Sequence, residues 1–375
     1  MSKGQSLPPE LYGEVLKHDV LNEEDLANCC LAGRRLLPFA RDRLYETISL
    51  PIYRAGELHA EDGEFKWMYN PSSDLFLYTV EESNILRHLV TKLEITVHQL
   101  LPMDDNSDDR LMHPESMLAQ LLRSTPQVIS LTLPEDWSEC LELRQAVYQE
   151  GERWIELDVD GDLDMRELES WSNLPNLKKL KCDYLRSRNG FERVDIPSQL
   201  EILHVNSIRT ESNPLPIPSL DAKLRVLRCF LSHDLLAFVV RSPTLEHLVL
   251  FDSLRPLQPP PDSSILSQFS KLPKLRSFSF TSRGSSPHFH PTLELLLAYL
   301  PSSVIRLDFP RHIPFDQLST FFASPVSSSI RTLGLSRQEA NSGASDKPLH
   351  MLQEVCETKG IKIEYVDEVE GVFHM

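Results

Sequence analysis

One acidic run has side chains at the spacing of a calcium-binding loop. DVDGDLDMRELE covers residues 158–169, and carboxylates are the ligands that Ca²⁺ prefers. Its candidate ligands are Asp158, Asp160, Asp162, Asp164 and Glu169. A calcium loop needs glycine where Leu163 stands, and Gly161 comes two positions too early. The preceding residues also have the pattern of a strand, whereas a calcium loop follows a helix. We therefore expect a solvated acidic turn and no metal.

The other reactive residue types do not form a catalytic or metal-binding pattern. His288 and His290 could give two imidazoles to a metal, but no further ligands are near them in the sequence. G-x-S-x-G, H-E-x-x-H and phosphate-loop motifs are missing. The six cysteines have no C-x-x-C or zinc spacing: Cys29, Cys30, Cys140, Cys182, Cys229 and Cys356. We expect no catalytic residues, no metal and no cofactor.

A short apolar signature recurs along the chain and predicts a repeat fold. WIELDV, LKKLKC, LEILHV, LRVLRC and LEHLVL each place apolar residues at a first position, three later, and two after that. Its central leucines are Leu157, Leu180, Leu203, Leu227 and Leu248, spaced by 23, 23, 24 and 21 residues. The same phase is found at Leu93, Leu131, Phe278, Leu307, Leu333 and Ile363. Repeats of this length bury their apolar sides against neighbouring repeats.

Each repeat combines a short strand with a helical stretch. The last two apolar positions alternate with polar ones, as expected for a strand with one buried face. Helical spacing occurs at 116–124, 232–240, 263–272, 291–300 and 314–322. A proline, which ends a helix and favours extended backbone, comes shortly before many strands. These prolines are Pro126, Pro175, Pro197, Pro243, Pro273, Pro301 and Pro325.

This pattern resembles a degenerate leucine-rich repeat over most of the chain after about residue 90. The resemblance implies an α/β fold in which parallel strands line the concave face of a solenoid and helices lie outside. The outward-facing strand residues Lys181, His204, Arg228 and Val249 are then candidate contacts for a target protein. A single α/β domain with one parallel sheet is the alternative interpretation.

Composition limits the classes of partner. The chain has 375 residues, 41% hydrophobic and 25% charged, as in soluble globular proteins. Its formal charge of −17 argues against nucleic acid as the main partner, because phosphate binding needs a basic surface. The sequence has no signal peptide pattern and no apolar run long enough for a membrane span. We expect an intracellular protein of the cytoplasm, the nucleus or both.

The first fifty residues lack the repeat and predict three short helices. LPPEL opens the first helix, Asn22 can cap the second, and the third follows the basic pair Arg34 and Arg35. About forty residues of helix make a small core, so this module is expected to need a partner. A helical cap on the repeats is the alternative.

The same segment resembles an F-box of the fungal type. It has an opening Leu-Pro, an acidic-leucine step at Asp25 and Leu26, a basic pair near the end, and the dipeptide Leu44–Tyr45 before a strand. The resemblance implies docking on the Skp adaptor and, through it, on a cullin. The residues expected to form or support that surface are Leu7, Pro8, Leu11, Val15, Leu16, Leu26, Cys30, Arg34, Arg35 and Leu36.

Two domains and one principal function follow from these patterns. We place an F-box module at residues 1–50 and a leucine-rich-repeat-like solenoid at 51–375, with an irregular leading segment at 51–90. The resemblance implies a non-catalytic substrate-recognition subunit of a Skp–cullin–F-box ubiquitin ligase, which binds a target protein through its repeats. A protein-interaction scaffold of the same architecture outside any ligase is the alternative. Neither nucleic acid nor membrane is an expected partner.

Overall fold

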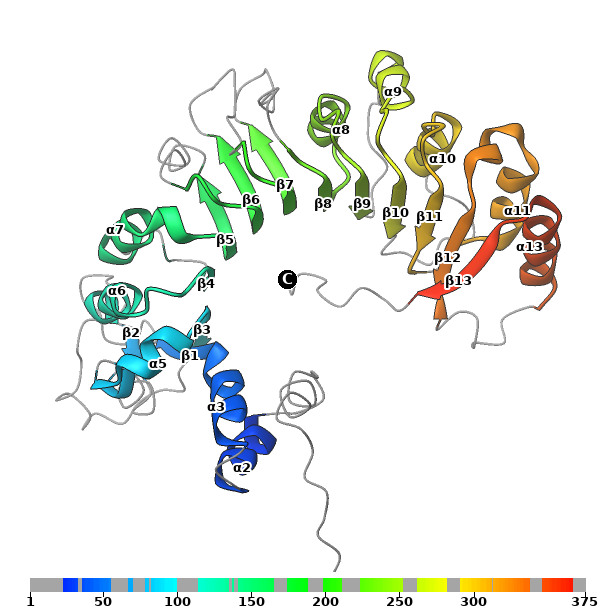
Figure 1. Ribbon diagram of the computed structural model, residues 1–375. Helices are drawn as coiled ribbons and strands as arrows, with labels where there is room; N and C mark the ends of the chain where they lie inside the picture. The colour runs from blue at the N-terminus through cyan, green and yellow to red at the C-terminus, as the bar shows by residue number, and fades with distance from the viewer. Residues whose placement is uncertain are drawn as a thin grey trace, which may run out of the picture. The chain divides into compact units, whose positions relative to one another are not determined.

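A computed structural model gives the architecture of the chain (Figure 1). It describes residues 23–32, 36–54, 67–69, 78–80, 82–99, 114–134, 137, 141–164, 174–187, 198–210, 223–251, 262–281, 291–311, 313–337 and 346–366. The chain divides into two compact units, Met1–Asp160 and Gly161–Met375, and the division falls within one strand, β5 (Glu156–Asp164).

Unit 1 combines an N-terminal helix pair with a small, mainly parallel sheet. Its helices are α2 (Glu23–Ala32), α3 (Leu37–Glu46), α5 (Asn84–Leu89), α6 (Pro114–Ser124), α7 (Leu141–Gln149) and the 3-10 turn η4 (Gly151–Arg153). Its strands are β1 (Thr47–Arg54), β2 (Trp67–Tyr69), β3 (Lys92–Gln99), β4 (Ser130–Leu133) and β5. The sheet order is β2-β1-β3-β4-β5, and all neighbours are parallel except the pair β1 and β2.

Unit 2 contains the regular repeats. Its strands are β6 (Lys179–Ser187), β7 (Ile202–Thr210), β8 (Val226–Phe230), β9 (His247–Phe251), β10 (Ser277–Thr281), β11 (Arg306–Phe309), β12 (Thr332–Ser336) and β13 (Lys362–Val366). They pair in parallel in chain order. The helices are α8 (His233–Val240), α9 (Ser263–Phe269), α10 (Pro291–Ala298), α11 (Phe315–Ala323), η6 (Pro325–Ser329) and α13 (Asp346–Lys359). They lie on one side of the strands (Figure 1).

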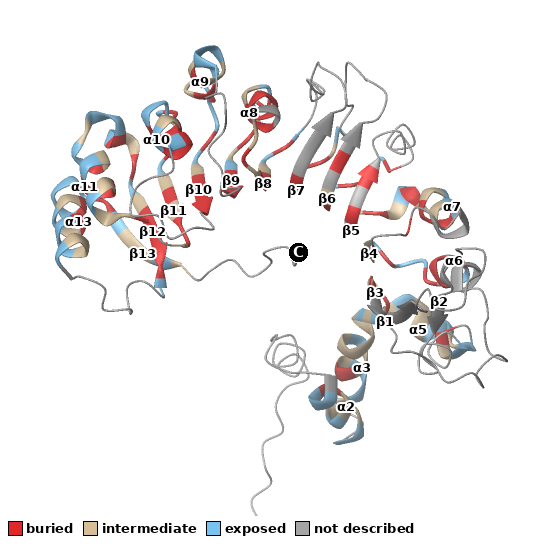
Figure 2. Cartoon of the chain, turned by 180° about the vertical axis from the view of Figure 1, so that it is seen from behind, coloured by how far each residue is buried: buried red, intermediate tan, exposed pale blue. Residues whose placement is uncertain are grey.

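The register confirms the predicted repeat phase. Leu180 pairs with Leu203, and the series continues through Leu227, Leu248, Phe278, Leu307 and Leu333 to Ile363. In unit 1, Leu93, Leu131 and Leu157 are likewise partners. These side chains are buried, as Figure 2 shows along the strands, except that Ile363 on the edge strand is half-buried. The α/β leucine-rich-repeat-like fold predicted from the sequence is confirmed.

The prolines act at a turn that recurs ahead of the strands. The amides of Val128, Leu177 and Leu245 each donate to the carbonyl three residues earlier, of Thr125, Leu174 and Ser242. In these turns the second residue is Pro126, Pro175 or Pro243, where the fixed φ of proline suits a β-turn. The repeat therefore encodes both the stop of one element and the start of the next strand.

The prediction of an acidic turn at residues 158–169 is wrong for residues 158–164. Residues up to Asp164 continue strand β5 because apolar or small residues alternate inward, and Leu157, Val159, Gly161 and Leu163 are all buried. Gly161 has φ 121°, a value that favours glycine. Glu169 lies outside the described residues, and so do His288 and His290. Among the described residues, no group of three or more His, Cys, Asp or Glu could hold a metal.

Arg153 connects the end of helix α6 with the residues that lead into strand β5. Its guanidinium donates to the carbonyl of Thr125, at 3.0 Å, and to that of Leu122 at the end of α6. It also lies over the ring of the fully buried Trp154, 4.5 Å from the centroid. Trp154 Nε1 in turn donates to the carbonyl of Val147 in α7 at 2.7 Å. One arginine thus satisfies a helix end and fixes the start of β5.

Candidate functional site: the open face of the repeat sheet

Unit 2 has a sheet face on which none of its described helices packs, and we call it the open face (Figure 1). Its central row consists of the residues that lie between the two apolar positions of each strand whose side chains point towards the helices. In strand order these are Lys181, His204, Arg228, Val249, Ser279, Asp308, Gly334 and Glu364, and each is the register partner of the next. The four residues expected to contact a target are therefore adjacent in space.

The β6–β8 end of the open face is basic. The pKa of His204 is lowered to about 4, first because the imidazole is largely buried and then because Arg228, Lys179 and Lys181 face it. Burial also lowers the pKa of the Arg228 guanidinium, which nevertheless stays protonated near neutral pH. His204 is consequently a neutral hydrogen-bonding group among cations.

Two aromatic rings adjoin this basic end. The Arg228 guanidinium lies 4.9 Å from the ring centroid of Phe251, a cation–π distance. Phe230 packs against Phe251 with centroids 5.6 Å apart. Phe251 is buried and Phe230 half-buried, and both lie on the same face of the sheet as Arg228, because Phe230 is two residues further along β8 and Phe251 is its register partner. The arrangement holds a charged side chain in place before any partner arrives.

A buried amide lies one step further along β7. Asn206 Nδ2 donates to Asp183 Oδ1 of β6 at 2.6 Å. Asn206 Oδ1 is buried and has no hydrogen-bond partner among the described residues. The Asp183 carboxylate thus belongs to the same end of the open face as the lysines of β6.

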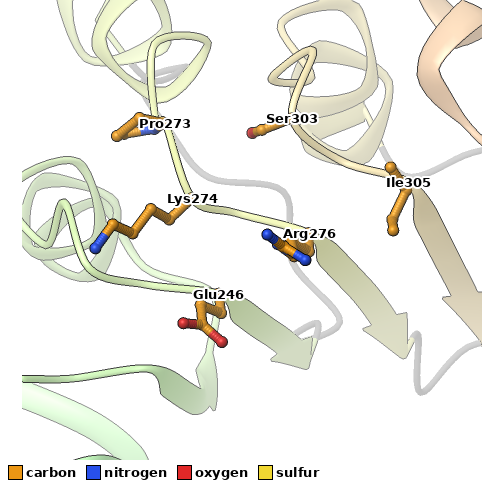
Figure 3. A pocket seen from close by; sticks show the side chains of 6 residues that line it. All are labelled: Glu246, Pro273, Lys274, Arg276, Ser303 and Ile305. Atoms are coloured by element: carbon orange, nitrogen blue, oxygen red, sulfur yellow. The ribbon is translucent and has the colours of Figure 1, made fainter.

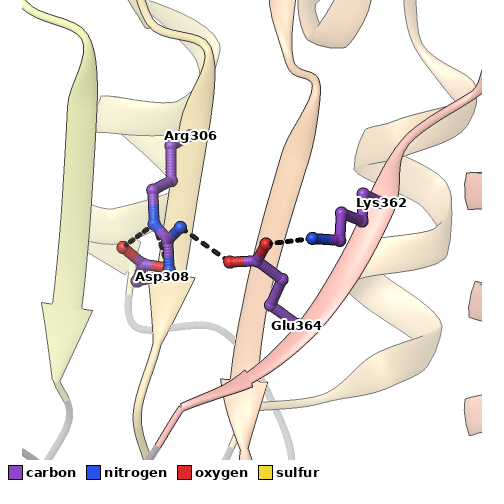
Figure 4. A network of polar contacts seen from close by, with 4 residues as sticks. All are labelled: Arg306, Asp308, Lys362 and Glu364. Atoms are coloured by element: carbon purple, nitrogen blue, oxygen red, sulfur yellow. Dashed lines mark hydrogen bonds and ion pairs between the residues drawn. The ribbon is translucent and has the colours of Figure 1, made fainter.

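The β11–β13 end neutralises its own charges (Figure 4). Arg306 donates through Nε to Asp308 at 2.8 Å and through Nη1 to Glu364 at 2.8 Å, and Lys362 donates to Glu364 at 2.7 Å. The bonds to Asp308 raise the pKa of Arg306 further, and the bond from Lys362 lowers the pKa of Glu364. The bridge from β11 to β13 passes over Gly334, where a Cβ would collide with Asp308 Oδ1.

A polar pocket of about 490 Å³ opens where β9, β10 and β11 begin (Figure 3). Its lining residues are Glu246, Pro273, Lys274, Arg276, Ser303 and Ile305. Glu246 is bonded to Arg225 at 2.8 Å, which lowers the pKa of the carboxylate. Ser303 Oγ donates to the carbonyl of Leu272. The carboxylate of Glu246 and the hydroxyl of Ser303 are thus each bonded to another group, Arg225 and a backbone carbonyl.

The helix side of unit 2 carries a second, more apolar hollow of about 600 Å³ beside α10, α11 and η6. Leu297, Ala298, Phe321 and Val326 give it its apolar lining. Its polar lining residues are Glu294, Gln317, Thr320 and Ser324.

The expected Skp-docking residues are only partly described. Leu26 is 6% exposed and forms a small core with the fully buried Ala40, against which Cys30 and Leu36 pack. Leu7, Pro8, Leu11, Val15, Leu16, Arg34 and Arg35 lie outside the described residues. Around this core, Leu31 is 86% exposed and Leu37 39% exposed. The second and third predicted helices are confirmed as α2 and α3.

Some features of the open face escaped sequence reasoning. The ion network has a signal in the sequence, since Arg306–Asp308 and Lys362–Glu364 are charged residues two apart in strands of matched phase. The contact between the rings of Phe230 and Phe251 has no signal in the sequence other than the matched phase of their strands. No described helix is both long enough and apolar enough to cross a membrane.

Comparisons with known proteins add a distant structural likeness. No protein-family profile and no curated protein matches the chain. Among solved structures, a leucine-rich-repeat protein of Leptospira interrogans aligns over 80% of this chain and 81% of its own, with 11% identity and a TM-score of 0.32.

The strand order and register by themselves define the class of fold: a leucine-rich-repeat-like solenoid, in which the described helices of unit 2 lie on one side of the parallel strands and the open face on the other.

Proposed function

We propose that this chain is the substrate-recognition subunit of a Skp–cullin–F-box ubiquitin ligase. The observation that carries the proposal is the helix pair α2–α3: among the residues that the structure describes, its core consists of Leu26 and Ala40 with a few half-buried neighbours, and Leu31 and Leu37 are exposed. So small a core gives little stability alone, and apolar side chains left in water favour a partner. The resemblance of this segment to an F-box supports Skp as that partner.

The helix pair has a firm attachment to the sheet of unit 1. Helix α3 runs directly into β1, and the carbonyl of Glu46 accepts bonds from both the amide and the hydroxyl of Thr91, at 3.0 and 3.2 Å. Thr91 immediately precedes β3, the parallel partner of β1. A Skp molecule docked on the helix pair would therefore be held in a fixed position relative to the sheet of unit 1.

The proposed contribution to ubiquitin transfer is proximity. Skp and cullin would bring the loaded conjugating enzyme, and the repeat scaffold would hold a target lysine at high effective concentration. No side chain of this chain takes part in the chemistry. A protein-interaction scaffold that never joins a ligase is the second candidate, favoured by the same open face.

Co-purification with Skp and cullin tests the proposal. The tagged full chain should retain both proteins, and Leu31→Glu with Leu37→Glu should remove them, because two carboxylates would enter an apolar interface. Leu7→Ala with Pro8→Ala should act in the same way.

Met351→Glu is the control, since this residue is 48% exposed on α13 of unit 2. Retention of Skp by both double variants would show that the docking surface is misplaced. Retention of Skp without cullin would favour the scaffold outside a ligase.

A further inference from the structure

Strand β13 ends the parallel ladder of unit 2 (Figure 1). Among the described residues it pairs with β12 along one edge, and no strand lies along its other edge. The amide of Lys362 donates to the carbonyl of Arg331, just before β12, at 2.9 Å. Because the backbone groups of successive strand residues point to opposite edges, those of Ile363 and Tyr365 point away from β12. These two residues therefore offer amides and carbonyls to a further strand.

The apolar rows of the core also continue into this edge. On β12, Leu333 and Leu335 are 0% and 1% exposed. Their register partners on β13 are Ile363, which is half-buried, and Tyr365, which is 42% exposed. Helix α13 packs mainly on α11, towards the preceding repeat. One more strand beside β13 would shield both side chains, so this edge offers apolar as well as hydrogen-bonding contacts.

The open-face side of β13 carries one charge of each sign. Lys362 and Glu364 are two residues apart, so their side chains leave the same face of the strand on either side of Ile363. Lys362 donates to Glu364 at 2.7 Å, and Arg306 bonds to the same carboxylate (Figure 4). The Lys362 side chain is still 73% exposed and that of Glu364 32% exposed. An ammonium has several donors and a carboxylate several acceptor positions, so both groups can take a further ion partner.

A second copy of the same strand is complementary to this edge. In an antiparallel pair with its two-fold axis at Ile363, this residue faces its own copy, and Lys362 of each chain faces Glu364 of the other. The two Ile363 residues then exchange amide-to-carbonyl bonds, because their backbone groups point outward. Lys362 and Glu364 form the non-hydrogen-bonded pairs, in which side chains lie closer together. An axis at Glu364 would instead place two carboxylates opposite each other, which is destabilising.

We propose that the chain forms a two-fold homodimer in which the β13 edges of two copies pair antiparallel, centred on Ile363. Such an isologous contact closes on itself, so assembly stops at two copies. It also protects a strand edge that would otherwise be a template for unspecific association. The inference does not depend on Skp binding, because it uses only the last strand of unit 2.

Disulfide trapping tests the register of the pair. In the proposed dimer the Cα atoms of the two Ile363 residues lie about 5.5 Å apart, within the range that a disulfide spans. The full chain with Ile363→Cys should therefore form a covalent dimer on mild oxidation, seen by non-reducing electrophoresis. Tyr365→Cys is the matched control, since it lies on the same face of the same strand but opposite Ile361 of the other copy. It should give no more covalent dimer than the native chain, whose own cysteines set the background.

Charge exchange tests the ion pairs. Sedimentation velocity should show a dimer of the native chain at micromolar concentrations. Lys362→Glu and Glu364→Lys should each raise the dissociation constant about tenfold or more, because like charges then face each other. A mixture of the two variants should form a heterodimer with most of the affinity restored, since every facing pair is again of opposite sign. Melting temperatures check the fold of each variant, because Glu364→Lys also loses the bond from Arg306.

A native chain that is monomeric at micromolar concentrations would overturn the inference. Equal trapping by Ile363→Cys and Tyr365→Cys would also overturn it, because the copies would then meet through another surface or at random. The trapping result decides even where a charge variant fails to fold, since both cysteine substitutions leave the charges of β13 in place.

Discussion

Gly334 shows how one missing side chain permits an ion network. It stands between Asp308 on β11 and Glu364 on β13, and the Arg306 guanidinium bonds to both carboxylates. A Cβ at this position would meet Asp308 Oδ1 and would lie 3.2 Å from Val366 Cγ1. Here glycine is needed for space and not for its backbone conformation.

The first prediction is that Gly334→Ala destabilises the protein by about 1–3 kcal/mol, the usual cost of overpacking. The added methyl group would push Asp308 away from Arg306. Urea unfolding measures the change. In an Asp308→Ser background the same substitution should cost clearly less, because the shorter side chain leaves room. Equal costs in the two backgrounds would disprove the steric explanation.

His204 links stability to pH. Its folded pKa of about 4 lies below the value near 6.5 of an unfolded histidine, so between these values the unfolded chain binds more protons. The stability that neutral His204 permits is therefore present near neutral pH and is lost as the pH falls from about 6.5 towards 4. Burial is the main cause, and the facing cations add to it.

The second prediction compares the native chain with His204→Gln at pH 7 and pH 5. The native chain should lose roughly 2 kcal/mol more than the variant over this interval, because only the native chain must avoid protonating a buried imidazole. Urea midpoints at the two pH values give the difference, and the other titrating groups cancel in the comparison. Parallel pH profiles would mean that His204 titrates normally.

At the scale of the element, the strands of unit 2 have a buried side that faces the helices and a side that belongs to the open face. Leu248 on β9 is fully buried towards the helices, and the next residue, Val249, is half-buried on the open face. Adjacent residues of similar chemistry thus have different roles because successive side chains of a strand point to opposite faces.

The third prediction follows from that alternation. Leu248→Ala should cost about 2–5 kcal/mol, as for a large cavity in a core, and Val249→Ala should cost less than about 1 kcal/mol. Chemical unfolding of the two single variants, made in the same preparation, gives the comparison. A larger cost for Val249→Ala would mean that the open face is packed against something and is not available to a partner.

The strands and most helices could be predicted because a single rule generates them. The apolar phase fixes the register from Leu180 to Ile363, and Pro126, Pro175 and Pro243 mark turns with a backbone bond that the structure repeats. The first part of strand β5 was predicted from WIELDV, but its continuation to Asp164 was mistaken for a turn because the aspartates suggested a loop, although Leu157, Val159 and Leu163 alternate inward. The antiparallel strand β2 and helix α7 follow no repeat, so nothing in the period announced them.

Sequence reasoning predicted which residues lie together in the candidate site, but not the contacts between them. Lys181, His204, Arg228 and Val249 were placed together by register alone. Sequence reasoning could not find that burial, helped by three facing cations, lowers the pKa of His204, or that Phe251 supports Arg228, since both depend on packing between strands. The Skp-docking prediction depended on a motif, and only Leu26, Cys30 and Leu36 of that motif lie in the described residues.

At the scale of the whole molecule, we propose a separate binding role for each of the two units. Unit 1 carries the helix pair proposed to bind Skp, and unit 2 carries the open face proposed to bind a target protein. Repeat sheets of this kind transmit little between distant strands, because each repeat contacts its neighbours. Substitutions on the open face should therefore leave Skp binding intact, and substitutions on α2 or α3 should leave the stability of unit 2 intact.

Hydrogen exchange with and without purified Skp tests the central claim most directly. We predict that Skp slows the exchange of backbone amides in the segment before Thr47, including α2 and α3. The exchange of amides in β6–β13 should stay unchanged. A complex that forms without protection of that segment, or the lack of any complex at micromolar concentrations, would contradict it.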